Sequence, residues 1–256
     1  MAKVFVCIPT WQGCLGPILD KQIDALSRQQ QRDELDIHFL VNNTDEAGFK
    51  EIERKAKELN AQTRDFGQIP FPLGLENLWN YAREQVLKED YTHLWILGGD
   101  NIPVPEYHFA HLLEADKDVI ASPAFLKDST LPATNVFQLT DTSSPFYPYK
   151  GAHELPLNQI FQLTEGMGTA SLLAKKKVLQ PIKFRWRTGG LCFLDTQFSE
   201  DIFKHGFEFY STTLIWTNHT RPNTTDFVTL ATDFPYCAGE FVKWRSQLNW
   251  GWWKYA

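Results

Sequence analysis

The chain has 256 residues, and its 31 acidic and 25 basic side chains give a formal net charge of −6. Hydrophobic residues make up 43% of the sequence and aromatic residues 14%, so the chain can bury a core, which excludes a mostly disordered or collagen-like protein. The acidic balance also argues against free nucleic acid as a partner, because binding to nucleic acid relies on a basic surface.

The N-terminal sequence MAKVFVCIPTWQG lacks the charged and apolar regions of a signal peptide, and no apolar run approaches the ~18 residues of a membrane span. We therefore expect a cytoplasmic protein without a transmembrane anchor. The cysteines form no CxxC pair, which predicts reduced structural thiols rather than disulfides or zinc ligands at Cys7, Cys14, Cys192 and Cys237.

Strands and helices alternate through the first half of the sequence. Short apolar runs predict strands at 3–8, 36–41, 93–97 and 118–122. Apolar residues at steps of three and four predict helices over 19–26, 49–59 and 75–86, and Pro105 is expected to open a fourth. This alternation indicates an α/β fold with a largely parallel, doubly wound sheet and helices on both faces, which binds ligands beyond the carboxyl ends of its strands.

The second half is less regular, with many prolines, serines and threonines from about residue 125. It still contains apolar patterns that predict a strand at 170–173, a helix at 195–205 and an extended hairpin or strand at 208–217. We expect one domain with halves at 1–124 and 125–220, followed by an aromatic C-terminal extension, 221–256, whose tryptophans we expect to pack on the domain.

Three polar clusters follow the first three clear strands, at Pro9-Thr10-Trp11, Asn42-Asn43-Thr44 and Gly98-Gly99-Asp100-Asn101. The carboxyl ends of parallel strands meet at one edge of a sheet, so these clusters are expected to converge. Amide groups there can read a nucleotide base and ribose, one carboxylate can hold a divalent cation that bridges phosphates, and the two glycines let the backbone approach a ligand.

Five segments in this order resemble the family 2 glycosyltransferases of the GT-A fold, over about residues 1 to 220. They are VFVCIPTWQG, HFLVNNTD, LWILGGDNIPVPEYHFAHLLEA, GMGTASLLAKKKVL and LDTQFSEDIFKHGFEFYSTTLIWTNH. The third is most similar to rhamnosyltransferase-like members. The resemblance implies a GT-A type fold with an irregular acceptor-side half after a nucleotide-sugar-binding half.

The resemblance also implies roles for individual residues. Asp100 matches the last acid of the D-x-D type loop that binds the metal, with Gly98 in place of the first acid, and His219 matches a terminal histidine that reaches toward the metal. Asp195 matches the catalytic aspartate, here preceded by Leu194. It would act as the general base in an inverting transfer of the donor sugar.

The implied donor is a nucleoside diphosphate sugar, with UDP as the default carrier and Mn or Mg as the cation. The acceptor would be a glycan or another hydroxyl-bearing molecule. The residues expected around the donor are Pro9, Thr10, Trp11, Asn42, Asn43, Gly99 and Asp100. Asn42 stands where the family usually has a base-reading aspartate.

Ordinary structural roles are open for the same residues: a turn for Asp100, a helix N-cap for Asp195, a structural histidine at His219 and an Asx turn at Asn42 or Asn43. Arg185 and Arg187 could contact phosphate, but solvated surface charges are the simpler interpretation. Two other functions also remain open. One is a nucleotidyltransferase, although IPTWQGCLG lacks the basic pair of that class, and the other is a non-catalytic binding protein derived from a transferase.

Overall fold

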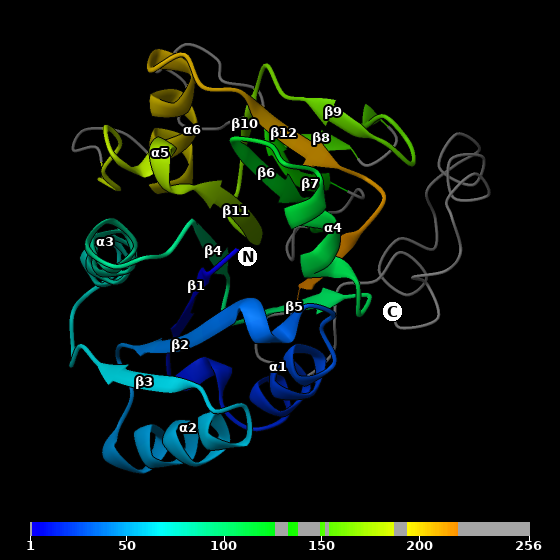
Figure 1. The fold of residues 1–256 in the computed structure, drawn as a ribbon. Coiled ribbons are helices and arrows are strands. Elements are labelled where there is room, and N and C mark those ends of the chain that lie inside the picture. The colour runs from blue at the N-terminus through cyan, green and yellow to red at the C-terminus, as the bar shows by residue number, and fades with distance from the viewer. Residues whose placement is uncertain (1, 126–132, 138–148, 152–153, 187–193, 220–256) are drawn as a thin grey trace.

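An eight-stranded sheet forms the centre of the protein, in the order β3-β2-β1-β4-β11-β6-β12-β9 (Figure 1). The computed structural model describes residues 2–125, 133–137, 149–151, 154–186 and 194–219. The strands are β1 (Val4–Thr10), β2 (Leu35–Val41), β3 (Gln62–Asp65), β4 (His93–Leu97), β6 (Val119–Ser122), β9 (Ile160–Gln162), β11 (Ser171–Lys175) and β12 (Phe209–Thr212). Only β11 and β9 run antiparallel to their neighbours, so the sheet is mostly parallel, as the sequence predicts.

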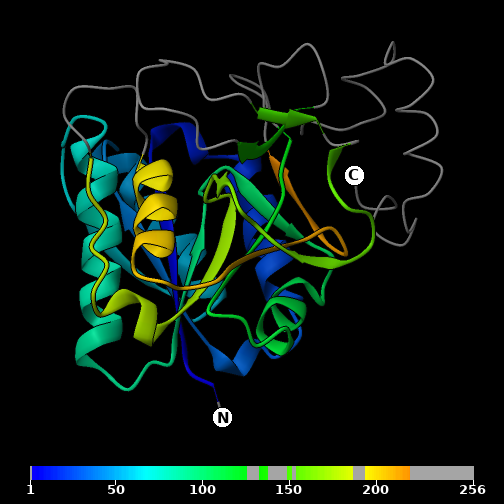
Figure 2. The same ribbon diagram turned by 90° about the horizontal axis from the view of Figure 1, so that it is seen from above.

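Helices cover both faces of this sheet because its strands carry apolar side chains on both sides. In β1, Val4, Val6 and Ile8 belong to one core cluster, and Phe5 and Cys7 belong to the other. The first cluster packs under α1 (Pro17–Ser27), α2 (Glu46–Glu58) and α4 (His108–Glu114). The second packs under α3 (Leu73–Lys88), α5 (Lys176–Leu179) and α6 (Leu194–Lys204), and Figure 2 shows α3 and α6 on the same side of the sheet.

Two smaller sheets complete the described part. Strand β5 (Asn101–Val104) pairs antiparallel with β13 (Trp216–His219), and β7 (Ala133–Phe137) lies between β10 (Gly166–Met167) and β8 (Tyr149–Gly151). Two short 3-10 helices, η1 (Gln12–Cys14) and η2 (Arg32–Glu34), flank α1.

The structure corrects several predicted boundaries. The first strand continues through Pro9 and Thr10, which pair with β2 beyond Cys7, the last residue of β1 that pairs with β4, so that Pro9 has a neighbouring strand on one side only. Pro105 does not open the fourth helix, which begins at His108 after the unpredicted strand β5. The segment 208–217 is neither one strand nor a hairpin, since β12 joins the large sheet and β13 pairs with β5.

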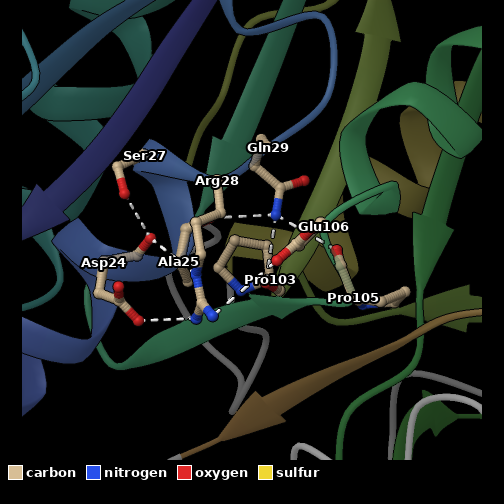
Figure 3. Close-up of polar contacts among 8 residues, drawn as sticks. All are labelled: Asp24, Ala25, Ser27, Arg28, Gln29, Pro103, Pro105 and Glu106. Atoms are coloured by element: carbon tan, nitrogen blue, oxygen red, sulfur yellow. Dashed lines mark hydrogen bonds and ion pairs between the residues drawn. The ribbon is translucent and has the colours of Figure 1, made fainter.

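A buried glutamine two residues after the end of α1, Gln29, fixes the segment between β5 and α4 (Figure 3). The Nε2 group of Gln29 donates to the carbonyl oxygens of Ala25, Pro103 and Pro105, at 3.2, 3.4 and 3.2 Å, respectively. Its Oε1 accepts from the backbone N–H of Phe109 at 3.0 Å. One side chain therefore satisfies backbone groups that neither a sheet nor a helix pairs.

Several expectations concern residues outside the described ranges, namely Arg187, Cys192, Cys237 and the extension 221–256. Cys7 and Cys14 are both buried. Within the described ranges, no helix has the length and apolar character needed to cross a membrane.

Candidate functional site

Asp100 lies in a tight turn between β4 and β5 that hydrogen bonds hold from three sides. The N–H of Gly98 donates to Ala170 O at 3.0 Å, and the N–H of Asn101 donates back to Gly98 O at 2.9 Å. The buried side chain of Gln22 on α1 donates to Gly98 O and Asn101 O, both at 3.0 Å. The turn therefore presents the Asp100 carboxylate from a fixed backbone, with Asn101 Nδ2 donating to its Oδ1 at 2.8 Å.

The two glycines of this turn serve packing inside the protein. A Cβ on Gly99 would lie 2.2 Å from Pro9 O, and one on Gly98 would lie 2.3 Å from Asn101 Nδ2. Glycine is thus required so that the β4–β5 turn can approach β1 and close on itself. Both glycines also line a cavity together with Asp100, so close approach of the backbone to a ligand stays a prediction.

His219 reaches Asp100 because of the pairing between β13 and β5. The register places His219 opposite Asn101, and its Nε2 lies 3.4 Å from Asp100 Oδ2. Its Nδ1 lies 2.9 Å from Phe125 O and donates to it, so in the neutral ring the Nε2 lone pair faces the carboxylate. Two acceptors that face each other in this way are stabilised by a proton or a cation between them. In metal sites, too, the second ring nitrogen of a histidine ligand often donates to a backbone carbonyl, which fixes the orientation of the ring.

Asp195 stands in the first turn of α6, where its Oδ1 accepts from the N–H of Thr196 at 2.9 Å. A Cβ on Gly168 would lie 3.1 Å from its Oδ2, so glycine is needed there for the link between β10 and β11 to pass close to the carboxyl group. Burial raises the pKa of Asp195 to about 6, although hydrogen bonds from the backbone at Thr196 and Thr169 act in the opposite direction.

One cavity of about 310 Å³ contains Asp100, His219 and Asp195 in its wall. We call it the Asp195 cavity; its other wall residues include Gly98, Gly99, Asn101, Asn135, Gly168, Thr169, Ala170, Trp79, Trp186 and Leu194. A second cavity of about 320 Å³, the Asn42 cavity, is lined by Thr10, Asn42, Asn43 and Leu78. Pro9, Trp11, Phe71 and Leu75 line both, so the two cavities adjoin. The three polar clusters therefore do converge.

Asn42 and Asn43 both hold the loop after β3. Asn42 is buried and pairs with the backbone of Ile69 through both ends of its amide, each at 3.1 Å. Asn43 Nδ2 donates to the same Ile69 O at 2.8 Å, and Asn43 adopts φ 54°, a left-handed conformation that asparagine tolerates. The two asparagines thus shape the Asn42 cavity by bracing one of its walls.

Thr10 and Trp11, at the end of β1, differ in exposure. The Thr10 side chain is buried and its hydroxyl donates to Ile8 O at 3.0 Å, within its own strand. Trp11 is 39% exposed and lines both cavities. Of these two residues, Trp11 has the greater surface available to a ligand.

The donor set at Asp100 and His219 fits a divalent cation. Carboxylate and imidazole together suit Mn²⁺ better than Mg²⁺, which prefers oxygen ligands alone. Asn101 Oδ1 is buried nearby with no hydrogen-bond partner among the described residues. Within the described ranges no cluster of three or more His, Cys, Asp or Glu is placed to hold a metal.

The described lining of both cavities contains no Lys or Arg. Arg185, a candidate phosphate contact, instead forms a two-pronged ion pair with Asp201, at 3.1 Å from Nε and 2.8 Å from Nη2. Its guanidinium stabilises a buried carboxylate on α6. The site thus offers two carboxylates, an imidazole and aromatic surfaces.

Sequence reasoning did not identify the aromatic residues Phe71, Trp79 and Trp186, or the buried Gln22. Trp79 lies on a predicted helix and follows the apolar spacing of a core residue, so its pattern carries no separate signal. Gln22 is the exception, because a glutamine on the apolar face of α1 is a polar residue at a core position and needs a partner.

Three solved structures are similar to this chain in fold. S. aureus TarS 1–349, solved in complex with UDP-GlcNAc, matches with a TM-score of 0.56 and 10% identity, over 82% of this chain and 56% of that one. The mannosyltransferase PcManGT from Pyrobaculum calidifontis, in complex with GDP-Man and Mn²⁺, gives 0.52 and 14%, over 81% and 53%. A197 from STIV gives 0.50 and 16%, over 86% and 85%.

At these identities the likeness shows the fold, which is a GT-A-like α/β fold. The match spans little more than half of the TarS and mannosyltransferase chains. Neither a family model nor a curated protein sequence matches the chain.

Proposed function

We propose that this protein transfers a sugar from a nucleoside diphosphate sugar to an acceptor hydroxyl, with inversion at the anomeric carbon. The observation that carries the proposal is that Asp100, His219 and Asp195 line one cavity at the carboxyl ends of parallel strands. Solved structures of the same fold contain UDP-GlcNAc, or GDP-Man with Mn²⁺, which supports this donor class. The similarity to the rhamnosyltransferase-like subgroup stays a prediction.

The Asn42 cavity is the proposed nucleoside site. Because Ile69 pairs with both ends of the Asn42 amide but only with Nδ2 of Asn43, the base would be read by Asn43 Oδ1 and by backbone groups of the braced loop, with Trp11 and Phe71 as apolar walls. Pro9, Thr10 and Gly99 would act as packing residues around the nucleotide. UDP is the proposed carrier.

The diphosphate of such a donor is an anion, and the described cavity walls hold no Lys or Arg to neutralise it. Asp100 and His219 would hold a divalent cation, which on binding supplies the positive charge that stabilises the leaving diphosphate. We therefore expect the sugar nucleotide to bind only when Mn²⁺ is present.

Asp195 is the proposed general base. It takes the proton from the acceptor hydroxyl as that oxygen forms a bond to the anomeric carbon. The bond from that carbon to the diphosphate oxygen breaks, and its electron pair leaves with the nucleoside diphosphate. A carboxyl group with a pKa of about 6 is mostly ionised at pH 7 and still basic enough to accept the proton.

A thermal-shift screen of UDP, GDP, CMP and dTDP sugars, with and without Mn²⁺, tests the donor site. A ligand that binds the folded state raises the unfolding temperature, so we expect a shift with one donor class that requires Mn²⁺. Asp100→Asn should abolish the shift. The control is Asp33→Asn, an exposed acid that lines neither cavity, which should keep it.

The same screen can contradict the proposal. A stabilising response to nucleoside triphosphates with release of pyrophosphate would indicate a nucleotidyltransferase. No response to any sugar nucleotide, with Mn²⁺ present and the protein folded, would leave the transferase proposal without a donor.

A further inference from the structure

One side of the Asp195 cavity is built from aromatic rings. We call Phe71, Trp79 and Trp186 the aromatic wall; all three line this cavity together with Asp195. Phe71 is 64% exposed, and its ring meets that of Trp186 edge to face, with 5.9 Å between centroids. The backbone N–H of Trp186 donates to Glu76 Oε2 at 2.8 Å, which fixes the residue against α3.

Trp79 adds an unused hydrogen-bond donor to this wall. The residue is 3% exposed and packs on Phe184 at 5.3 Å, yet its indole Nε1 is buried without a partner among the described residues. Buried polar groups in native proteins are nearly always paired, so a donor left over beside a cavity indicates a ligand that carries an acceptor.

The charges around the wall limit the ligand further. Asp100 and Asp195 are both in the cavity lining, and its described part has no Lys or Arg. The donor diphosphate would already use the cation at Asp100. Among the described lining residues, a phosphorylated or carboxylated acceptor would therefore face the Asp195 carboxylate with no Lys or Arg to balance its charge, whereas a neutral acceptor needs none.

We propose that the acceptor is an uncharged saccharide whose pyranose ring stacks on the aromatic wall and directs a hydroxyl to Asp195. This inference rests on the proposed function. A pyranose presents an apolar C–H face that aromatic rings can cover and carries hydroxyl groups at its edge, which matches a mostly aromatic wall with one base and one spare donor. Open-chain polyols have the hydroxyls but lack the face.

The test measures release of nucleoside diphosphate from the donor class found in the thermal-shift screen, with Mn²⁺, on adding candidate acceptors. Methyl hexopyranosides should accelerate the release, and the matching hexuronates, hexose 6-phosphates and open-chain hexitols should not. Trp186→Ala should raise the acceptor KM by about tenfold, the effect of one lost aromatic contact, and the donor KM by much less, because Trp186 lines the Asp195 cavity and not the Asn42 cavity. Phe71→Ala should raise both KM values, since Phe71 lines both cavities. Trp186→Phe should restore most of the acceptor KM.

Tyr107→Ala is the matched control, since this tyrosine is 40% exposed and lines neither cavity, and it should leave the acceptor KM unchanged. Equal acceleration by hexitols or hexose phosphates, or an unchanged acceptor KM in both alanine variants, would overturn the saccharide inference. So would a lack of acceleration by every pyranoside while the donor still binds with Mn²⁺. Failure of the donor to bind at all would instead remove the proposed function on which the inference rests.

Discussion

Burial of the Asp195 carboxyl group raises its pKa, and hydrogen bonds from the backbone lower the pKa by less than burial raises it. Its pKa of about 6 reflects a carboxylate that has lost water on one side while keeping donors from the start of α6. Asp195 is the second residue of α6 and not its N-cap, and its bond to the Thr196 N–H in the first helical turn is compatible with a role as a catalytic base. The half-buried position leaves the group in contact with the cavity.

The rate of the proposed sugar transfer should depend on the ionisation of the Asp195 carboxyl group. Asp195 must be deprotonated to act as a base, so kcat/KM should rise with pH up to about 6 and level off above it. Asp195→Asn should lower kcat by about 10² to 10⁴, the usual contribution of a general base. A pH profile with no acidic limb near pH 6, or an active asparagine variant, would contradict this role.

Stability should change in the opposite sense at the same residue. The folded-state pKa lies above the ordinary 3.8, so ionisation costs the folded state free energy; the cost is absent below about pH 4 and complete above about pH 6. Asp195→Asn removes it, and should raise the free energy of unfolding at pH 8 by about 1 to 3 kcal/mol. Urea unfolding of both proteins at pH 8 and pH 4 measures the difference in the free energy of unfolding. If Asp195→Asn were stabilised equally at both pH values, ionisation of Asp195 would not be the cause.

At the scale of elements, α1 controls the position of the turn that holds Asp100. Gln22 lies on the buried face of α1, and Gln29 lies two residues beyond the end of the helix at Ser27. Their amides donate to carbonyl groups along 98–105, Gln22 at the Asp100 turn and Gln29 at the end of β5. Helix α1 and the residues just after it thus position the turn and the strand that pairs with His219.

Replacing each glutamine separates positioning from general stability. Gln22→Met should weaken Mn²⁺-dependent donor binding by about tenfold, because Asn101 O loses its donor and the Asp100 turn loosens. Gln29→Met should lower the free energy of unfolding by about 1 kcal/mol and should have a smaller effect than Gln22→Met on the Mn²⁺ dependence of donor binding. Titration of the donor with Mn²⁺, beside urea unfolding, distinguishes them. Equal effects of both variants on Mn²⁺ dependence would contradict a specific role for Gln22.

At the scale of the whole molecule, a buried polar network joins the large sheet to the β5–β13 pair. His108 Nδ1 donates to Val104 O at 3.0 Å, and its Nε2 lies 3.0 Å from Ser171 Oγ, which also accepts from Trp95 Nε1 at 2.9 Å. On β6, Ser122 contacts both His108 and Thr217 of β13. The strand that carries His219 is thus tied to the centre of the fold.

This network should make the protein sensitive to acid. Burial lowers the pKa of His108 to about 4, below the ordinary 6.5, so the unfolded chain takes up the proton first as the pH falls. The stabilisation is complete above pH 6.5 and declines toward pH 4, by about 3 kcal/mol for this residue. His108→Gln should be less stable at pH 7 but lose less stability between pH 7 and pH 5. A slope equal to that of the native chain would exclude His108 as the cause.

The sequence by itself determined the alternation of strands and helices, because apolar period and turn residues are local properties. It therefore also placed Asp100 and the asparagines at the ends of parallel strands. The short strands β3, β5, β7, β8, β9 and β10 escaped this reasoning, since pieces of two to five residues have no clear period and are stabilised by pairing with other segments.

Only the tertiary structure decided which of these residues share a cavity. His219 meets Asp100 through the register of β13 against β5, and Asp195 reaches the same space because Gly168 lets a distant link pass beside it. The same packing turned Asn42 toward Ile69 and Arg185 toward Asp201. Such contacts join residues far apart in the chain, and their geometry depends on packing and register that no local pattern encodes.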